Sequence, residues 1–228
     1  MIKIKIFIDA GHGGTDPGAT ANGLKEKDLT LTIAKETKRI LDNEYKGHTT
    51  KLSRDKDIKQ SLKERVNLAK KFGAEFFLSI HINAGGGYGF ESFIYNGKLM
   101  AKTSTLRNIT HKEIMKQLKC KDRGMKKANF VVLRKSSCPA MLTENLFIDN
   151  KEDSQKLKDK NYLNKIAKGH ALGLAKALNL KNKNNVISSS EDKSLYRVIA
   201  GSYNKKENAI DQYNYLKSKG IESFILKI

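Results

Sequence analysis

Two histidines and two glutamates stand where a fold could use them for metal chemistry. His12 follows the apolar run "IKIFIDAG" inside a glycine-rich loop, and Glu26 comes fourteen residues later at the start of a helical pattern. His81 ends the apolar run "FFLSIHI", and Glu144 lies at the far end of another, "PAMLTEN". Two histidines and one glutamate form the ligand set of many catalytic zinc sites, which leave the fourth position to water. The second carboxylate, Glu144, could accept a proton from that water.

Three of these residues also have an ordinary structural interpretation. His12 could be an exposed loop histidine and His81 a core histidine with its hydrogen bonds satisfied. Glu26 could simply favour the positive end of a helix dipole. Gly11, Gly13 and Gly14 argue for a site, because residues without side chains would bring the backbone close to a metal and leave room for a large substrate. The other histidines fit packing or surface roles: His48, His111 and His170.

The elements that must position these residues indicate an α/β fold. Strand-like apolar runs cover 3–9, 48–52, 75–82, 89–95, 129–133 and 140–146. Helical periodicity covers 27–43, 60–72, 99–118 and 161–178. Alternating strands and helices predict a single, mostly parallel, twisted sheet with helices on both faces. In such open sheets, sites form at the carboxyl ends of the strands, where the candidate residues lie.

Six stretches, taken in order along residues 3–180, resemble the zinc-dependent N-acetylmuramoyl-L-alanine amidases of the amidase-3 type. They include "IFIDAGHGGTDPGATANGLKEKDLTL", "FFLSIHINAG", "DRGMKKANFVVLR" and "PAMLTENLFIDNKED". Sporulation autolysins and phage endolysins use this domain. The resemblance implies one Zn²⁺ and cleavage of the amide between N-acetylmuramic acid and L-alanine in peptidoglycan. His12, Glu26 and His81 match the family's zinc ligands, and Glu144 matches its catalytic carboxylate.

The chain is expected to have three parts. Residues 1–180 would form the zinc amidase domain, and the polar run 181–194 would be a linker. Residues 195–228 predict a small strand–helix–strand (βαβ) appendix and are similar to half of a SPOR repeat, a wall-glycan-binding module. One unit of this size buries too little surface to be stable alone. We therefore expect it to pair with a second copy and form a homodimer, with aromatic residues such as Tyr203, Tyr215 and Phe224 in its core.

Charge and composition limit the partners. The formal net charge is +20, which favours association with polyanions such as anionic wall polymers. No nucleic-acid-binding motif accompanies that charge. No apolar run is long enough to span a membrane, and the first residues lack the pattern of a signal peptide. We expect synthesis in the cytoplasm, action on the wall after release or lysis, and two free thiols at Cys120 and Cys138.

Other functions stay open at this point. A zinc peptidase or a glycan deacetylase could use a related site, and these enzymes differ from an amidase in their products. A wall-binding protein with an inactive site would need none of the four candidate residues. A basic nucleic-acid binder would need only the net charge, and its binding would be sensitive to salt.

Overall fold

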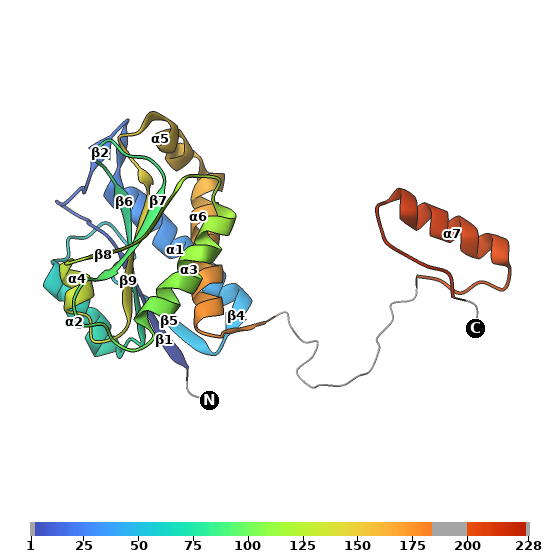
Figure 1. Ribbon diagram of the computed structural model, residues 1–228, viewed down its shortest axis with the longest axis horizontal. Coiled ribbons are helices and arrows are strands. Elements are labelled where there is room, and N and C mark those ends of the chain that lie inside the picture. The colour runs from blue at the N-terminus through green and yellow to red at the C-terminus, as the bar shows by residue number, and fades with distance from the viewer. Residues whose placement is uncertain (1–2, 184–199, 227–228) are drawn as a thin grey trace. The chain divides into compact units, whose positions relative to one another are not determined.

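The computed structural model describes residues 3–183 and 200–226 (Figure 1). The chain divides into two units, Met1–Val186 and Ile187–Ile228. The first unit contains a six-stranded sheet in the order β5-β1-β6-β9-β7-β8. Its strands are β1 (Ile4–Ala10), β5 (His48–Leu52), β6 (Phe76–Asn83), β7 (Phe90–Tyr95), β8 (Asp122–Ala128) and β9 (Ala140–Phe147).

All neighbouring strands of this sheet run parallel except β7 and β9. The helices of the unit are α1 (Glu26–Glu44), α2 (Leu62–Phe72), α3 (Thr103–Gln117), α4 (Val131–Arg134), α5 (Lys151–Lys158) and α6 (Lys160–Ala177). Short strands pair as β2 (Thr20–Ala21) with β3 (Leu24–Lys25), and as β4 (Tyr45–Lys46) with β10 (Lys181–Asn182). The predicted α/β class with a mostly parallel sheet is confirmed.

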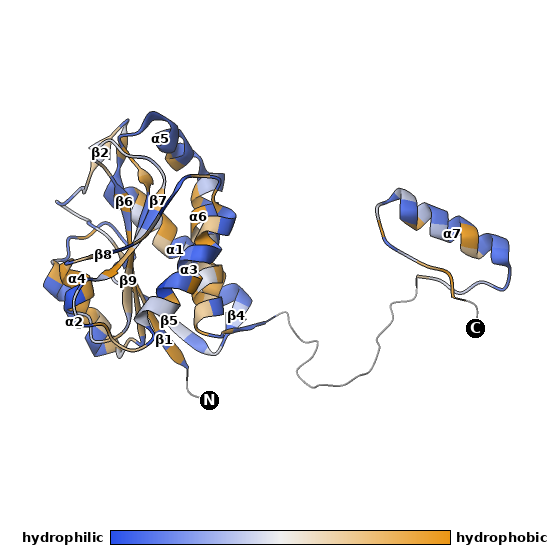
Figure 2. Ribbon diagram, viewed as in Figure 1, coloured by the Kyte–Doolittle hydropathy of each residue, from blue (hydrophilic) through white to orange (hydrophobic). Residues whose placement is uncertain are grey.

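Helices cover both faces of the sheet because side chains alternate along each strand. Ile6 and Ile8 of β1 pack into the larger core cluster, with α1 and α6. Phe7, between them, packs with Val66 of α2 and Val132 of α4 on the other face. Figure 2 shows the corresponding apolar bands on the central strands and on parts of the covering helices. The helices on both faces of the sheet thus pack against the same central strands that carry the candidate site.

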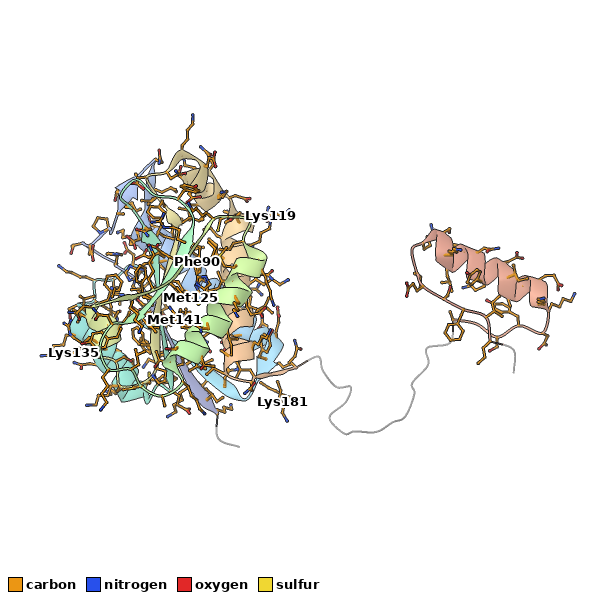
Figure 3. All side chains as sticks on the ribbon, viewed as in Figure 1. Phe90, Lys119, Met125, Lys135, Met141 and Lys181 are labelled. Atoms are coloured by element: carbon orange, nitrogen blue, oxygen red, sulfur yellow. The ribbon has the colours of Figure 1, made fainter. Side chains whose placement is uncertain are left out.

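Many of the lysines lie at the periphery of the first unit. Lys119, Lys135 and Lys181 are exposed, whereas Phe90 and Met141 are buried in the interior (Figure 3). Of the helices in residues 3–183 and 200–226, none combines the length and apolarity that a membrane span requires. Both cysteines are free, as predicted.

Two sequence-based assignments in this unit were wrong in the type of element, and the helix predicted over 99–118 begins only at Thr103. The apolar run at 129–133 was predicted as a strand, but Val131–Arg134 forms α4 and the strand is β8, just before it. A five-residue apolar run suits a buried helical turn as well as a strand, and here Val132 and Leu133 enter the core as one turn. Residues 181 and 182 of the predicted linker form β10 instead, since β4 offers them a pairing partner.

In the second unit, α7 (Lys206–Ser218) forms where a helix was predicted. The predicted closing strand is wrong for residues 221–226, which have no regular secondary structure. A strand needs a partner for its backbone groups, and no strand is described in residues 200–226. Most of the predicted opening strand, and residues 184–194 of the linker, lie outside the described residues. Tyr203, Tyr215 and Phe224 are all exposed within the single chain.

Candidate metal centre

His12 is held in an unusual backbone conformation just after β1. Its φ is 60°, a left-handed value that few side-chain-bearing residues adopt. The guanidinium of Arg65 donates a hydrogen bond to the His12 carbonyl at 2.7 Å, which anchors this turn. Asp16 Oδ2 lies 2.9 Å from His12 Nδ1. Because a carboxylate accepts, Nδ1 carries a proton, and Nε2, which faces Glu26, is the nitrogen that would bind a metal in the neutral imidazole.

Glu26 occupies the first position of α1 and is 4% exposed. Its Oε1 lies 3.2 Å from His12 Nε2 and 3.0 Å from His81 Nδ1. Backbone N–H groups of Ile82 and Ala19 donate to its two oxygens at 3.0 and 2.9 Å. Burial alone would raise the Glu26 pKa, but the hydrogen bonds from the two histidines outweigh it and hold the pKa far below its usual range. This carboxylate is therefore ionised at any physiological pH.

Glu144 lies beside His81 on the neighbouring strand. The two residues are directly paired in the parallel β6–β9 ladder, so their side chains emerge on the same face of the sheet. Glu144 Oε2 is buried and has no hydrogen-bond partner among the described residues. Burial is the main cause that raises the pKa of Glu144 to about 7. The charge of His81 lowers this pKa, and the charges of Glu26 and Glu91 raise it further. An unpaired buried carboxylate is costly and is typical of a functional group.

The donor set fits a zinc ion. His12, Glu26 and His81 each offer one ligand atom, and these atoms lie within 4.8 Å of one another. Two imidazole nitrogens and one carboxylate oxygen match the ligands of catalytic zinc sites. No other such group of three occurs in the described part of the chain. Both imidazole rings are partly solvent-exposed, so a substrate could reach a metal held between them.

The glycines of the loop act differently from the sequence-based expectation. A Cβ on Gly11 would lie 2.5 Å from the His81 ring, so Gly11 does make room at the site. Gly13 and Gly14 do not, because their missing side chains would meet the backbone of Ile58 and Lys59. Gly18, which was not singled out, has φ +65°, and a Cβ there would lie 2.6 Å from Glu26 Oε2. The space-making positions at the site are therefore Gly11 and Gly18.

Sequence reasoning missed the buried groups that shape the loop. Arg65 forms an ion pair with Asp9 at 2.7 Å, and both side chains are at most 3% exposed. Arg54 donates to the carbonyls of Gly11 and Lys27 at 2.9 and 2.7 Å. No local pattern indicates these contacts, since Arg54 lies 43 positions after Gly11 and Arg65 lies 53 positions after His12. The charge of Asp9 at the end of an apolar strand was the one signal available.

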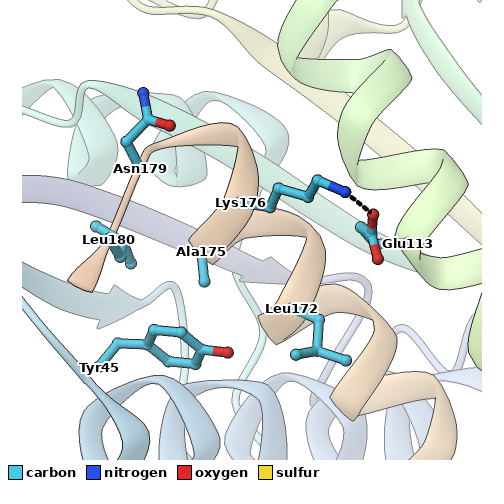
Figure 4. A pocket seen from close by; sticks show the side chains of 7 residues that line it. All are labelled: Tyr45, Glu113, Leu172, Ala175, Lys176, Asn179 and Leu180. Atoms are coloured by element: carbon cyan, nitrogen blue, oxygen red, sulfur yellow. Dashed lines mark hydrogen bonds and ion pairs between the residues drawn. The ribbon is translucent and has the colours of Figure 1, made fainter. Parts of the chain in front are cut away.

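The remaining histidines and one surface hollow lie apart from this chemistry. His48, His111 and His170 are each at most 9% exposed and have packing roles. A hollow of about 460 Å³ is lined by seven residues from β4, α3, α6 and the segment that follows α6 (Figure 4). Its charged groups, Lys176 and Glu113, pair with each other at 2.6 Å. It contains no cluster of metal-ligating side chains, and we assign it no chemistry.

The four predicted site residues are thus gathered at one end of the sheet. The family model for N-acetylmuramoyl-L-alanine amidase, Amidase_3, matches residues 6–176. The chain is 48% identical over 223 residues to the sporulation-specific N-acetylmuramoyl-L-alanine amidase of Bacillus subtilis (strain 168), covering 98% of this chain and 84% of that protein. It is 48% identical over 184 residues to the endolysin of Bacillus phage SPP1, covering 78% of this chain and 67% of that protein.

Solved structures agree with these sequence relatives. The crystal structure of N-acetylmuramoyl-L-alanine amidase from Clostridium difficile 630 has a TM-score of 0.75 at 34% identity, covering 78% of this chain and 98% of that one. The catalytic domain of CwlV, an N-acetylmuramoyl-L-alanine amidase from Bacillus (Paenibacillus) polymyxa var. colistinus, has a TM-score of 0.74 at 31% identity, covering 78% and 99%. The chain therefore belongs to the Amidase_3 family of N-acetylmuramoyl-L-alanine amidases, enzymes that act on peptidoglycan.

Proposed function

We propose that this amidase is zinc-dependent and hydrolyses the amide between the lactyl group of N-acetylmuramic acid and the L-alanine of the stem peptide. The observation that carries the proposal is the convergence of His12, Glu26 and His81 around one point, with Glu144 beside them. His12, His81 and Glu26 would hold the ion. When bound, zinc lowers the pKa of a coordinated water and polarises the substrate carbonyl.

The chain's own groups do the proton transfer. Glu144 accepts a proton from the attacking water and donates it to the departing L-alanine nitrogen, which leaves as an amine. Its burial and its unpaired Oε2 suit this role, because no competing hydrogen bond holds the carboxylate away from the water. Asp16 keeps His12 in the tautomer whose Nε2 faces the site. The mechanism needs no serine or cysteine nucleophile.

Metal content and activity test the zinc assignment together. Dialysis against a chelator should abolish release of L-alanine N-termini from peptidoglycan, and one equivalent of Zn²⁺ should restore it. Metal analysis should find about one zinc per wild-type chain and far less in His81→Ala, with His48→Ala as the matched histidine control. Full activity without metal would refute the proposal. A zinc peptidase or glycan deacetylase would pass the metal test but would release internal peptide amines or acetate.

For the second unit, the proposal is that residues 195–228 act as a half SPOR-like segment that associates with a second copy. The catalytic domain predicted over 1–180 would then extend through β10 (Lys181–Asn182), and the rest of the predicted linker, up to residue 194, would connect the two units. Support comes from large apolar side chains of the second unit that are exposed, with Phe224 at 76%. No residue of α7 is buried. Light scattering should show a dimer for the full chain and a monomer for residues 1–190, and a full-length monomer at high concentration would refute this.

The net charge supports a further electrostatic proposal, that anionic wall polymers add to substrate binding. At +20, the protein should bind walls less tightly as salt rises from about 0.05 to 0.5 M, because screening shortens the range of its field. Walls stripped of anionic polymers should lose this dependence. Equal binding across the salt range would show that the excess lysines have no part in wall association.

A further inference from the structure

Three acid–base side chains form a row across neighbouring strands. His81, Glu144 and Glu91 are paired in register on β6, β9 and β7, so they emerge on one face of the sheet. Glu91 is 4% exposed, and Asn83 donates to its Oε1 at 2.8 Å. Since adjacent strands lie about 4.8 Å apart, Glu91 stands one strand spacing from the proposed catalytic carboxylate. The row therefore continues past Glu144, on the side away from the metal centre.

The edge strand β8 extends this row with two cations. Between the pairs Phe90–Asp122 and Ser92–Met125 the register shifts, so that one residue of β7 faces two of β8. Gly124, in this bulge, has φ +90°. The extra residue places Arg123 and Lys126, three positions apart, on the same face, and both pair with Glu91 Oε2. Bulges commonly re-aim side chains next to active sites in this way.

The cluster of Glu91, Arg123 and Lys126 carries a net positive charge. One carboxylate is paired with two cations, which are 27% and 40% exposed. Arg123 Nη2 and two of the three Lys126 N–H groups have no hydrogen-bond partner within residues 3–183 and 200–226. The Arg123 guanidinium also lies 4.8 Å over the Phe147 ring, which helps to fix its direction. Two cations that are held in place by Glu91 and still have free N–H donors are suited to binding a second carboxylate.

We propose that Arg123 and Lys126 bind a free carboxylate on the second residue of the stem peptide, so that the enzyme prefers substrates with this group free rather than amidated. This inference rests on the proposed amidase function. An extended peptide advances about 3.5 Å per residue, so the second residue lies about 7 Å from the scissile amide. The cationic head groups stand one to two strand spacings, about 5 to 10 Å, from the strand of Glu144. Glu91 serves as a positioning residue that holds the two cations.

The test compares two soluble N-acetylmuramoyl pentapeptides that differ only in the second residue, D-glutamate or its α-amide. For the wild type, we expect kcat/KM to be at least about tenfold higher for the free acid, the range of a charge-assisted hydrogen bond. Lys126→Gln and Arg123→Gln should bring this ratio close to one. Lys127→Gln is the matched control, because Lys127 pairs with Ile94, whose side chain is on the opposite face. It should keep the wild-type ratio.

Two outcomes would overturn the inference. The first is a wild-type ratio of kcat/KM, free acid over amide, that is near one. The second is an equal loss of activity on both substrates in Lys126→Gln and Arg123→Gln, since that result indicates a purely structural ion-pair cluster. Calorimetry of the binding of both pentapeptides to the Glu144→Gln variant gives the same comparison without turnover. If the wild type cleaves neither fragment, the proposed function fails, while tighter binding of the free acid that depends on Lys126 would still support the carboxylate site.

Discussion

Replacing Arg65 with methionine should uncouple the His12 loop from the sheet. Arg65 pairs with Asp9 at 2.7 Å and donates to the carbonyls of Ala10 and His12 at 2.6 and 2.7 Å. Methionine fills similar space but leaves a buried carboxylate without its partner. Removing one member of a buried ion pair costs about 3–5 kcal/mol. We therefore expect the zinc-free Arg65→Met protein to lose about that much free energy of unfolding, measured by urea denaturation.

A second variant separates charge from loop positioning. Asp9→Asn combined with Arg65→Met removes the stranded charge, so about half of the lost stability should return. The His12 carbonyl still lacks its donor, so zinc affinity in a chelator competition should stay at least about tenfold below wild type. Lys63→Met, an exposed change on the same helix, should stay within about 0.5 kcal/mol of wild type. An Arg65→Met protein within about 1 kcal/mol of wild type would refute the reasoning.

Three shorter predictions follow from the same geometry. Asp16→Ala should weaken zinc binding about 10- to 100-fold, whereas loss of its exposed hydrogen bonds with His12 and Gly18 should cost the zinc-free protein only about 1 kcal/mol in urea denaturation. Unaltered zinc affinity would contradict the role given to Asp16. Gly18→Ala places a Cβ 2.6 Å from Glu26 at positive φ, so both zinc affinity and stability should fall, the latter by about 1–2 kcal/mol in urea denaturation. Burial lowers the pKa of His170 to about 4, so between pH 6.5 and 4 the unfolded state binds a proton that the folded state does not. The free energy of unfolding should therefore fall by about 3 kcal/mol as the pH drops through that window. His170→Gln should flatten this decline, and an unchanged pH slope would show that His170 is not its source.

Local patterns predicted the central strands because these are buried apolar runs. The run before His12 and the run before Glu144 were assigned within about one residue of β1 and β9. The edge strand β8 escaped prediction because "DRGMKKA" has no apolar period, and the bulge at Gly124 breaks the alternation that would reveal a strand. Pattern and length therefore suffice for strands with a buried face, including the edge strand β5, but not for β8, which has no fully buried residue.

The residues of the site likewise fall into two groups, those that a local pattern predicts and those that it does not. His12, Glu26, His81 and Glu144 were predictable because each lies in or next to a recognisable element: a loop after a strand, the first turn of a helix, or the second half of a strand. The groups that orient them were not, because they depend on contacts between distant segments. Arg65 reaches the loop from more than fifty residues away, and the cation pair beside Glu91 depends on a bulge that only the strand register reveals.

The most direct test of the account is the bond that is broken and the residue that breaks it. Purified peptidoglycan is digested with the wild type, with Glu144→Gln and with zinc-depleted enzyme, and new N-termini and new reducing sugars are both measured. We predict N-terminal L-alanine without new reducing ends for the wild type, reduced about 10²- to 10⁴-fold in Glu144→Gln and absent without zinc. New reducing ends, or a Glu144→Gln enzyme as active as the wild type, would contradict the account.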